Sequence, residues 1–400
     1  MITMRRSFVA VAGAIALVSS ANAALVHPLP PAAGSSESYA QSIDAGGNVV
    51  GYSRDGGTDL PTLWRPTAGG YVAEALPLVP GAAAGAANSI SAGSGAIVGY
   101  VQPADLSTAS ATVWTAPPAS AYAASPLPSP AGSALTSAYA VNDAGTAVGY
   151  QETASAATAA VAWNFTGGTY AAALLPAPAG WLDTAATTIN GSGDIGGYRF
   201  MVIDGEIDVQ GVVWQNSGAG TYTPKTIIAT ETVIPTAAMN DAGIGAGVIG
   251  NEPAVIALFE GDYYAFELPQ PFGTTDGAAN AVNAHDAIAG YLKDPETTTS
   301  GPEAALWLPT ESFWELVNLD RWLDETDATL GSQWTLTEAF GLTDSWLVTG
   351  DGLYDPDGPS GPLAAVERGF VLDASTLVPE PSAGVIALIA GVRLLKRRRR

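Results

Sequence analysis

The sequence contains no cysteine and only two histidines among its 400 residues. The lack of cysteine excludes disulfides, thiolate-bound metals and a thiol nucleophile. His27 and His285 are far apart in the chain, so no histidine cluster for zinc or for a catalytic triad can be recognised locally. Two common routes to a catalytic site therefore find no support in the sequence.

Basic residues are also scarce outside the two ends of the chain. Of the 15 lysines and arginines, eight lie in the terminal segments, which leaves seven against 37 acidic residues in the body. A net charge of about −30 repels nucleic acid and anionic lipid and favours solubility and divalent cations. We therefore expect no nucleic-acid partner.

No apolar run reaches the length that crosses a bilayer as a helix, but a short one lies near the N-terminus. Arg5 and Arg6 precede the run from Phe8 to Val18, and Ala21 and Ala23 form a small-x-small cleavage site. This pattern predicts a signal helix within residues 1–23, which is removed after Ala23 during export. The paired arginines resemble a twin-arginine signal, so Sec export and twin-arginine export both remain open.

The body of the chain repeats one phrase seven times, typified by Asn142-Asp-Ala-Gly-Thr-Ala-Val-Gly149-Tyr150. A period of 43 to 60 residues is typical of propellers and arrays. The register glycines are Gly51, Gly99, Gly149, Gly197, Gly247, Gly290 and Gly350. A large residue follows each of them, which we place at Trp64, Trp114, Trp163, Trp214, Phe259, Trp307 and Phe370.

Each repeat divides into four short strands. Asn and Asp cap the turn between the first two strands, where glycine accepts a positive φ. The fourth strand ends at a Leu-Pro pair, because proline cannot donate to a sheet ladder. An alanine such as Ala40 or Ala138 marks a crowded first strand near the axis, and the Trp and Tyr side chains are expected to fill the core between repeats.

The last repeat lacks its fourth strand, but Leu25-Val-His-Pro-Leu-Pro30 resembles one. A ring closed by this segment has no long open edge. The sequence therefore predicts an all-β fold, a closed seven-bladed propeller of four-stranded blades over residues 24–377, with the N-terminal strand completing the last blade. A short helix is also expected at Asn318 to Thr326, where Leu319, Trp322 and Leu323 share one face.

The connections between second and third strands vary most, so binding is expected on the face that carries them. Asp351, Asp355 and Asp357 in the last repeat are weak candidates for a calcium site, since calcium prefers several oxygen ligands. Paired carboxylates could instead hydrolyse a glycosidic bond, although the sequence fixes no pair at a defined separation. No catalytic or cofactor-binding residue can be assigned.

The C-terminal segment, residues 378–400, resembles the PEP-CTERM sorting signal. Pro379, Glu380 and Pro381 form the motif, an apolar run from Ala383 to Val392 predicts a short hydrophobic helix, and Arg397, Arg398, Arg399 and Arg400 end the chain. The resemblance implies recognition by an exosortase in a Gram-negative bacterium that makes exopolysaccharide. The basic end would hold the precursor at the inner membrane until processing near Pro379 to Pro381 sends the body to the cell surface or the extracellular space.

The repeats from Ala24 to Asp373 resemble the HAF-type extracellular repeats, most closely at the Gly-x-Val-Val-Gly-Tyr core. Trp334 to Ala339 and Arg368 to Leu372 match the closing phrases of that family. The resemblance implies location and fold but no activity. We therefore expect a non-enzymatic surface or matrix protein that binds a glycan or a surface protein, and the alternative is a propeller hydrolase or lyase acting on extracellular polysaccharide.

Overall fold

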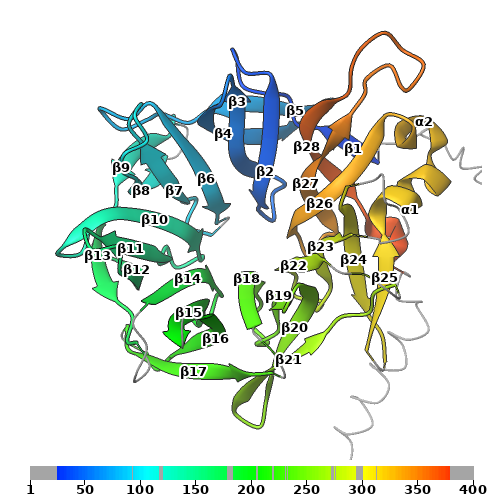
Figure 1. Cartoon of the computed structure of the whole chain (residues 1–400). Coiled ribbons are helices and arrows are strands. Elements are labelled where there is room, and N and C mark those ends of the chain that lie inside the picture. Colours follow the sequence, from blue (N-terminus) through cyan, green and yellow to red (C-terminus); the bar gives the residue numbers. More distant parts are fainter. Residues whose placement is uncertain are drawn as a thin grey trace, which may run out of the picture.

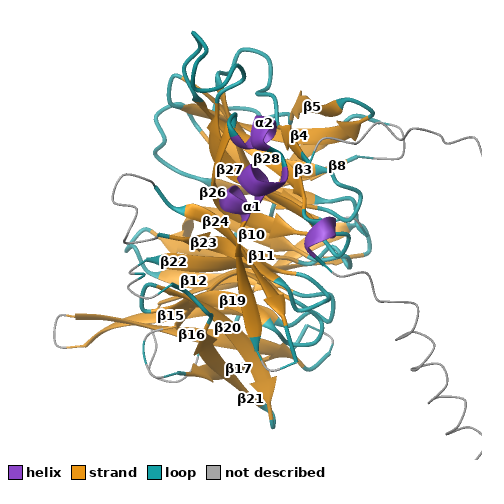
Figure 2. Cartoon of the chain, turned by 90° about the vertical axis from the view of Figure 1, so that its right-hand side faces the viewer, coloured by secondary structure: helices purple, strands orange, loops and turns teal. Residues whose placement is uncertain are grey.

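The computed structural model describes residues 25–378, apart from 92, 117–119, 178–182, 204–205, 219, 230, 232, 272–273, 275, 294–300 and 312. The described chain is an all-β propeller whose small twisted sheets surround a central axis (Figure 1). The first strand of each repeat lies nearest the axis. Figure 2 shows the ring from its edge, with the long β15–β16 hairpin projecting from one side.

Four of the sheets contain four consecutive antiparallel strands, as the repeat predicts. They are β2 (Glu37–Ile43), β3 (Val49–Asp55), β4 (Thr58–Thr67) and β5 (Gly70–Ala75); β6 (Ala84–Ile90), β7 (Ile97–Gln102), β8 (Ser110–Thr115) and β9 (Ala123–Pro126); β10 (Ser133–Val141), β11 (Ala147–Thr153), β12 (Thr158–Thr166) and β13 (Thr169–Leu174); and β22 (Gly277–Val282), β23 (Ile288–Leu292), β24 (Glu303–Pro309) and β25 (Trp314–Asn318). We call the sheet β2–β5 the first sheet.

Between β13 and β22 lies one eight-stranded sheet in the order β14-β15-β16-β17-β21-β20-β19-β18. Each half is antiparallel, and a short parallel pairing of Ile227 and Ile228 with Tyr263 and Tyr264 joins the two outer strands. The strands are β14 (Asp183–Ile189), β15 (Ile195–Ile203), β16 (Glu206–Asn216), β17 (Tyr222–Ile228), β18 (Val233–Met239), β19 (Gly245–Ile249), β20 (Glu252–Phe259) and β21 (Asp262–Glu267).

The last sheet takes one strand from each end of the chain and is called here the closing sheet. Its order is β1-β28-β27-β26, made of β1 (Val26–Pro28), β26 (Trp334–Leu342), β27 (Leu347–Tyr354) and β28 (Val366–Asp373). Val26 pairs with Leu372, and the amide of Leu29 donates to the carbonyl of Gly369 at 2.8 Å. The prediction that Leu25 to Pro30 completes the last sheet is confirmed.

Two short helices, α1 (Leu319–Thr326) and α2 (Ala328–Gly331), separate β25 from β26, and a 3₁₀ turn (Ser375–Leu377) follows β28. The Asn318 side chain caps α1 by accepting from the amide of Arg321. Leu319 and Leu323 are fully buried against the sheets, and Trp322 packs beside them, as the sequence pattern predicts. The helix therefore covers apolar surface of β24 and β26.

The register glycines are required because two strands meet there without room for a side chain. A β-carbon added at Gly51 would overlap the carbonyl oxygen of Tyr39 on the neighbouring first strand. The same overlap with the paired carbonyl recurs at Gly99, Gly149, Gly197, Gly290 and Gly350. The cause is a β-bulge in each first strand, such as the one between Ala40 and Ser42, which pushes the backbone toward its partner.

The tryptophans join each sheet to the one before it. The indole N–H of Trp163 donates to the carbonyl of Pro128 at 2.8 Å, which lies just after β9 of the preceding sheet. Equivalent bonds run from Trp64 to Pro30, Trp114 to Pro77, Trp214 to Pro176 and Trp307 to Pro269. All five rings are fully buried. Pro30 thus has the role of a repeat Leu-Pro pair, although it belongs to the N-terminal segment.

Two of the seven residues predicted to be equivalent to the tryptophans, Phe259 and Phe370, are wrong in register. The tryptophans pair with the residue two before the register glycine, and in the fifth and seventh repeats that partner is Ile256 or Leu372. Phe259 lies at the tip of the β20–β21 hairpin and is 62% exposed. The β19–β20 turn is short, so the third strand begins earlier than in other repeats. Phe370 is buried, but it sits two residues before the tryptophan position.

Asparagines of the turns connect neighbouring sheets on one face of the ring. The Asn142 side chain accepts from its own turn at Thr146 and donates from Nδ2 to the carbonyl of Asn190 at 3.0 Å. Asn190, Asn240 and Asn283 repeat this donation to Asn240, Asn283 and Thr343. The turn motif is therefore explained by structure, because each copy satisfies its own backbone and holds the next one.

Candidate functional site

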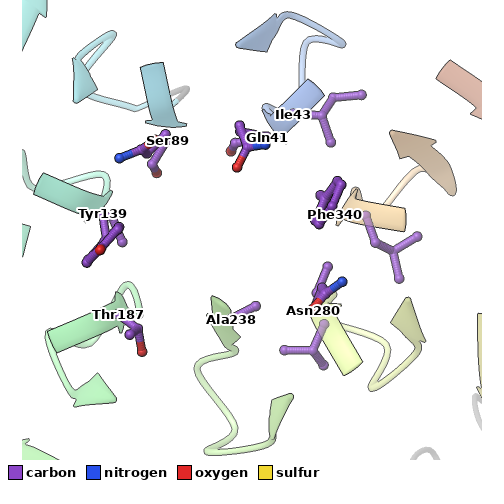
Figure 3. A pocket seen from close by; sticks show the side chains of 15 residues that line it. Gln41, Ile43, Ser89, Tyr139, Thr187, Ala238, Asn280 and Phe340 are labelled. Carbon is purple, nitrogen blue, oxygen red and sulfur yellow. The ribbon is translucent and has the colours of Figure 1, made fainter. Parts of the chain in front are cut away.

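A cavity of about 360 Å³ lies on the axis of the ring and is called here the axial cavity. Its lining comes from the first strands of all seven repeats, and Figure 3 labels Gln41, Ile43, Ser89, Tyr139, Thr187, Ala238, Asn280 and Phe340. Several of these are bulge residues, and a bulge redirects a side chain out of the sheet. Among the described residues the lining has amides, hydroxyls and two aromatic rings but no charged group.

A second cavity of about 760 Å³, called here the side cavity, lies between the first sheet and the closing sheet. Gln41 and Phe340 line both cavities, so the two adjoin. Pro302, from the connection before β24, also lines it, which places it on the face with the variable connections. The sequence predicted binding on this face.

Two tyrosines of the first sheet form one wall of the side cavity. Tyr39 and Tyr52 are cross-strand partners, and their rings stack with centroids 4.9 Å apart. The Arg54 guanidinium lies over both rings at 4.8 and 5.2 Å and binds Asp59. Burial is the main cause that raises the pKa of Tyr52 to about 12, so both phenols stay neutral hydrogen-bonding groups at physiological pH.

Three carboxylates of the closing sheet form the opposite wall, from Glu338, Asp351 and Glu367. Asp351 follows its register glycine, where five other repeats have a tyrosine: Tyr52, Tyr100, Tyr150, Tyr198 and Tyr291. Its Oδ1 accepts from the amide of Ala40 in the first sheet at 2.8 Å. The break in the repeat therefore places a carboxylate at the contact between the two ends of the ring.

The pKa of each of these carboxyls is raised. Burial is the largest cause for all three and raises the pKa of Asp351 well above its usual range, while the Ala40 amide opposes it. Burial and the charges of Asp276 and Glu367 raise the pKa of Glu338, and burial and Glu37 raise that of Glu367. The charged neighbours that raise these three pKa values are all carboxylates.

The predicted metal ligands are not brought together. Asp351 faces the side cavity from β27, whereas Asp355 and Asp357 lie in the loop after it. Asp357 accepts from the amide of Leu363 at 3.3 Å, and Asp355 Oδ1 is buried with no hydrogen-bond partner in the described part of the chain. Within the same part, no group of three or more His, Asp or Glu side chains could hold a metal ion.

The signal-cleavage residues Ala21 and Ala23, the motif Pro379 to Pro381 and the basic end Arg397 to Arg400 lie outside the described residues. The predicted terminal helices fall there too. Within residues 25–378, as far as the structure describes them, no helix has the length and apolarity needed to span a bilayer.

Sequence reasoning missed Glu338, Glu367 and Gln41 as members of one site. It also placed all repeat tyrosines in the core, whereas Tyr52, Tyr100 and the other tyrosines after the register glycines are only partly buried. An alignment of the seven copies gives one available signal, because Asp351 is the single acidic residue after a register glycine. Glu367 approaches that position through the pairing of β27 with β28, and the approach of Tyr39 and Tyr52 depends on ring closure.

No family model matches the sequence, and no curated protein matches it. Three solved structures are similar at low identity. XC5397 from Xanthomonas campestris, a gluconolactonase, has a TM-score of 0.35 and 10% identity over 64% of this chain and 83% of its own. YCF48 bound to a D1 peptide has a TM-score of 0.44 and 13% identity, over 87% of this chain and 93% of its own. AofleA from Arthrobotrys oligospora has a TM-score of 0.38 and 13% identity, over 70% of this chain and 81% of its own.

Proposed function

We propose that the protein is exported, is sorted to the cell surface through its PEP-CTERM-like tail, and uses its propeller as a non-enzymatic module that binds glycan. The signal pattern before Ala23 and the motif Pro379 to Pro381 support the address. The HAF-like repeats support an extracellular setting. An exosortase-type enzyme and the export machinery are then its processing partners.

The ring in this proposal has seven blades. The eight-stranded sheet counts as two blades, because each half has the strand order of the other repeats and only the β17–β21 pair joins them. The seven copies of the repeat phrase support the same count. One position from each copy then reaches the axial cavity.

The observation that carries the binding function is the lining of the two adjoining cavities. The side-chain amide of Gln41 can exchange hydrogen bonds with sugar hydroxyls, and the Oδ1 of Asn280 can accept one although its Nδ2 donates to the carbonyl of Ala339. Tyr139 and Phe340 offer apolar faces. The axial cavity lacks carboxylates among its described lining, so it supplies no acid–base pair for glycosidic cleavage. A glycan-binding cavity of this kind fits a surface protein.

The raised pKa values of Glu338 and Asp351 favour a second candidate, a hydrolase or lyase acting on extracellular polysaccharide. A carboxyl with a raised pKa can serve as a general acid. Asp351 already holds the Ala40 amide, which is a structural use of the same group. Binding without turnover is therefore our first choice.

The test uses the fragment 24–377 on a glycan array and in a turnover assay that counts new reducing ends and unsaturated products. Binding that weakens in Gln41→Ala and Tyr139→Ala variants, without turnover, is expected. Arg321→Ala on α1 is the matched surface control and should bind normally. Turnover that disappears in Glu338→Gln would favour the enzyme, and an array without any bound glycan would refute the module.

A separate test addresses the sorting. Replacing Pro379, Glu380 and Pro381 by alanine should leave the precursor in the membrane fraction at full mass, which is measured by fractionation and mass spectrometry. Normal processing and release of this variant would contradict the sorting proposal and leave the binding proposal intact.

A further inference from the structure

The side cavity is lined by three kinds of side-chain group, which are carboxylates, aromatic rings and an amide. Its carboxylates come from Glu338, Asp351 and Glu367, its ring wall from Tyr39 and Tyr52, and its amide from Gln41, which also reaches the axial cavity. A volume of about 760 Å³ admits a ligand larger than an ion or a water cluster.

None of the ion pairs among the described residues includes Glu338, Asp351 or Glu367. Arg54 is bound to Asp59 behind the tyrosine pair, and Arg368 donates to the carbonyl of Ser36. The carboxylate of Glu338 makes no hydrogen bond with any described residue, and one oxygen of Asp351 accepts from Ala40. Carboxylates held close together without a cation repel one another, and a cationic group placed among them gains a charge-assisted hydrogen bond.

We propose that the side cavity binds the protonated amine of an amino sugar, with the carboxylates around the ammonium group and the sugar ring directed toward the axial cavity. This inference rests on the proposed glycan binding and names its ligand class. The ammonium group donates three hydrogen bonds, and the carboxyl groups of Glu338, Asp351 and Glu367 line the cavity that would receive it. The amides, hydroxyls and aromatic rings near Gln41 and Phe340 suit a hydroxylated ring rather than a second charge.

The experiment measures binding of the fragment 24–377 to three probes by calorimetry at pH 6.5, where glucosamine amines are largely charged. The probes are a glucosamine tetramer, its fully N-acetylated counterpart and tetralysine. We expect the glucosamine tetramer to bind at least 10-fold more tightly than the acetylated one, since acetylation removes the charge.

Variants then locate the site. Glu338→Gln and Asp351→Asn keep the shape of each side chain, and the amide oxygen introduced at position 351 can still accept from the backbone N–H of Ala40. Each variant should weaken binding of the glucosamine tetramer about 10-fold, while binding of the acetylated tetramer stays unchanged. Asp357→Asn, in the loop beyond β27, is the matched control and should bind like the parent. A single cooperative melting transition in each variant shows that it is folded.

The outcomes separate the two proposals. Equal affinity for the charged and acetylated tetramers would refute the amine site and keep the glycan-binding function. Tetralysine binding as tightly as the glucosamine tetramer would refute the sugar and point to a lysine-rich peptide. No binding of either tetramer, together with a blank glycan array, would refute both proposals.

Discussion

The contact between the closing sheet and the first sheet can be compared with the contact between β6–β9 and β10–β13. Both use a buried tryptophan that donates to a proline carbonyl, from Trp64 to Pro30 and from Trp163 to Pro128. They differ after the register glycine, where the regular contact has Tyr100 and the closing contact has Asp351. The packing at the closing contact is therefore the same as at a regular contact, but a carboxylate replaces a phenol there.

The comparison shows that the residues that pack the ring and the residues that could contact a ligand occupy different positions of the repeat. The glycine, the tryptophan and the turn asparagine recur because each satisfies backbone groups or fills the core. Position 351 lies on the wall of a cavity, where a carboxylate can be accommodated as long as its hydrogen bonds and solvation are partly retained. The four predictions below test this comparison.

The largest effect is expected from removing the segment that exists only at the closure. A fragment lacking residues 25–30 loses β1, the buried Leu29 and the carbonyl partner of Trp64, and it exposes the edge of β28. We expect aggregation, or a loss of about 5 kcal/mol or more in the free energy of unfolding. Chromatography and thermal melting measure this. Adding the missing peptide should restore stability, and a truncated protein as stable as the parent would contradict closure by β1.

The second prediction tests whether the register glycine matters equally at both contacts. Gly149→Ala and Gly350→Ala should each cost about 4 kcal/mol, because the new methyl group overlaps the carbonyl of Ser137 or Glu338. Gly69→Ala is the control, since no atom lies within 4 Å of its β-carbon position. Chemical denaturation measures the three values. A mild effect at Gly350 alone would show that the closing sheet is looser than the others.

The third prediction compares the two tryptophans. Trp64→Phe and Trp163→Phe each remove the donor of a partly buried hydrogen bond to a proline carbonyl, which costs about 1 kcal/mol beyond the change in packing. The fifth repeat shows that an aliphatic residue can occupy this position, because Ile256 is there and is buried. If the two variants lose similar amounts of stability in melting experiments, the two tryptophans stabilise their contacts equally. A much larger loss at Trp64 would mean that the closure depends on this bond more than a regular contact does.

The smallest effect concerns Asp351 and appears as a dependence on pH. Its pKa is raised in the folded protein, mainly by burial, so its favourable contribution is complete below the unfolded value near 4 and is lost as pH rises through the folded value. The parent should therefore lose stability relative to Asp351→Asn as the pH rises above about 4. Asp357→Asn is the control, and Asp351→Tyr restores the repeat residue. Parallel pH curves for parent and Asp351→Asn would contradict the raised pKa.

Much of the fold could be predicted from the sequence because the recurring residues of each repeat meet local backbone requirements that do not depend on the rest of the chain. Glycine at 149, asparagine at 142 and the Leu-Pro pair each satisfy a backbone need that recurs along the chain. Register failed where the connections change length, as at Phe259, since a short turn moves the third strand relative to its neighbour. The side cavity was beyond reach, because Tyr39, Glu338 and Glu367 meet only after the ring closes.

The pairing of β1 with β28 also determines how the protein responds to mechanical force. The strands are antiparallel, and the amide of Asp373 donates to the carbonyl of Leu25, so both ends of the chain leave from the same point of the rim. A force that pulls the two ends apart acts first on the hydrogen bond between Asp373 and Leu25. The hydrogen bonds between β1 and β28 then break one after another and not all together. Traction through a single end leaves this pair unloaded. A tether at only one terminus therefore preserves the ring under shear.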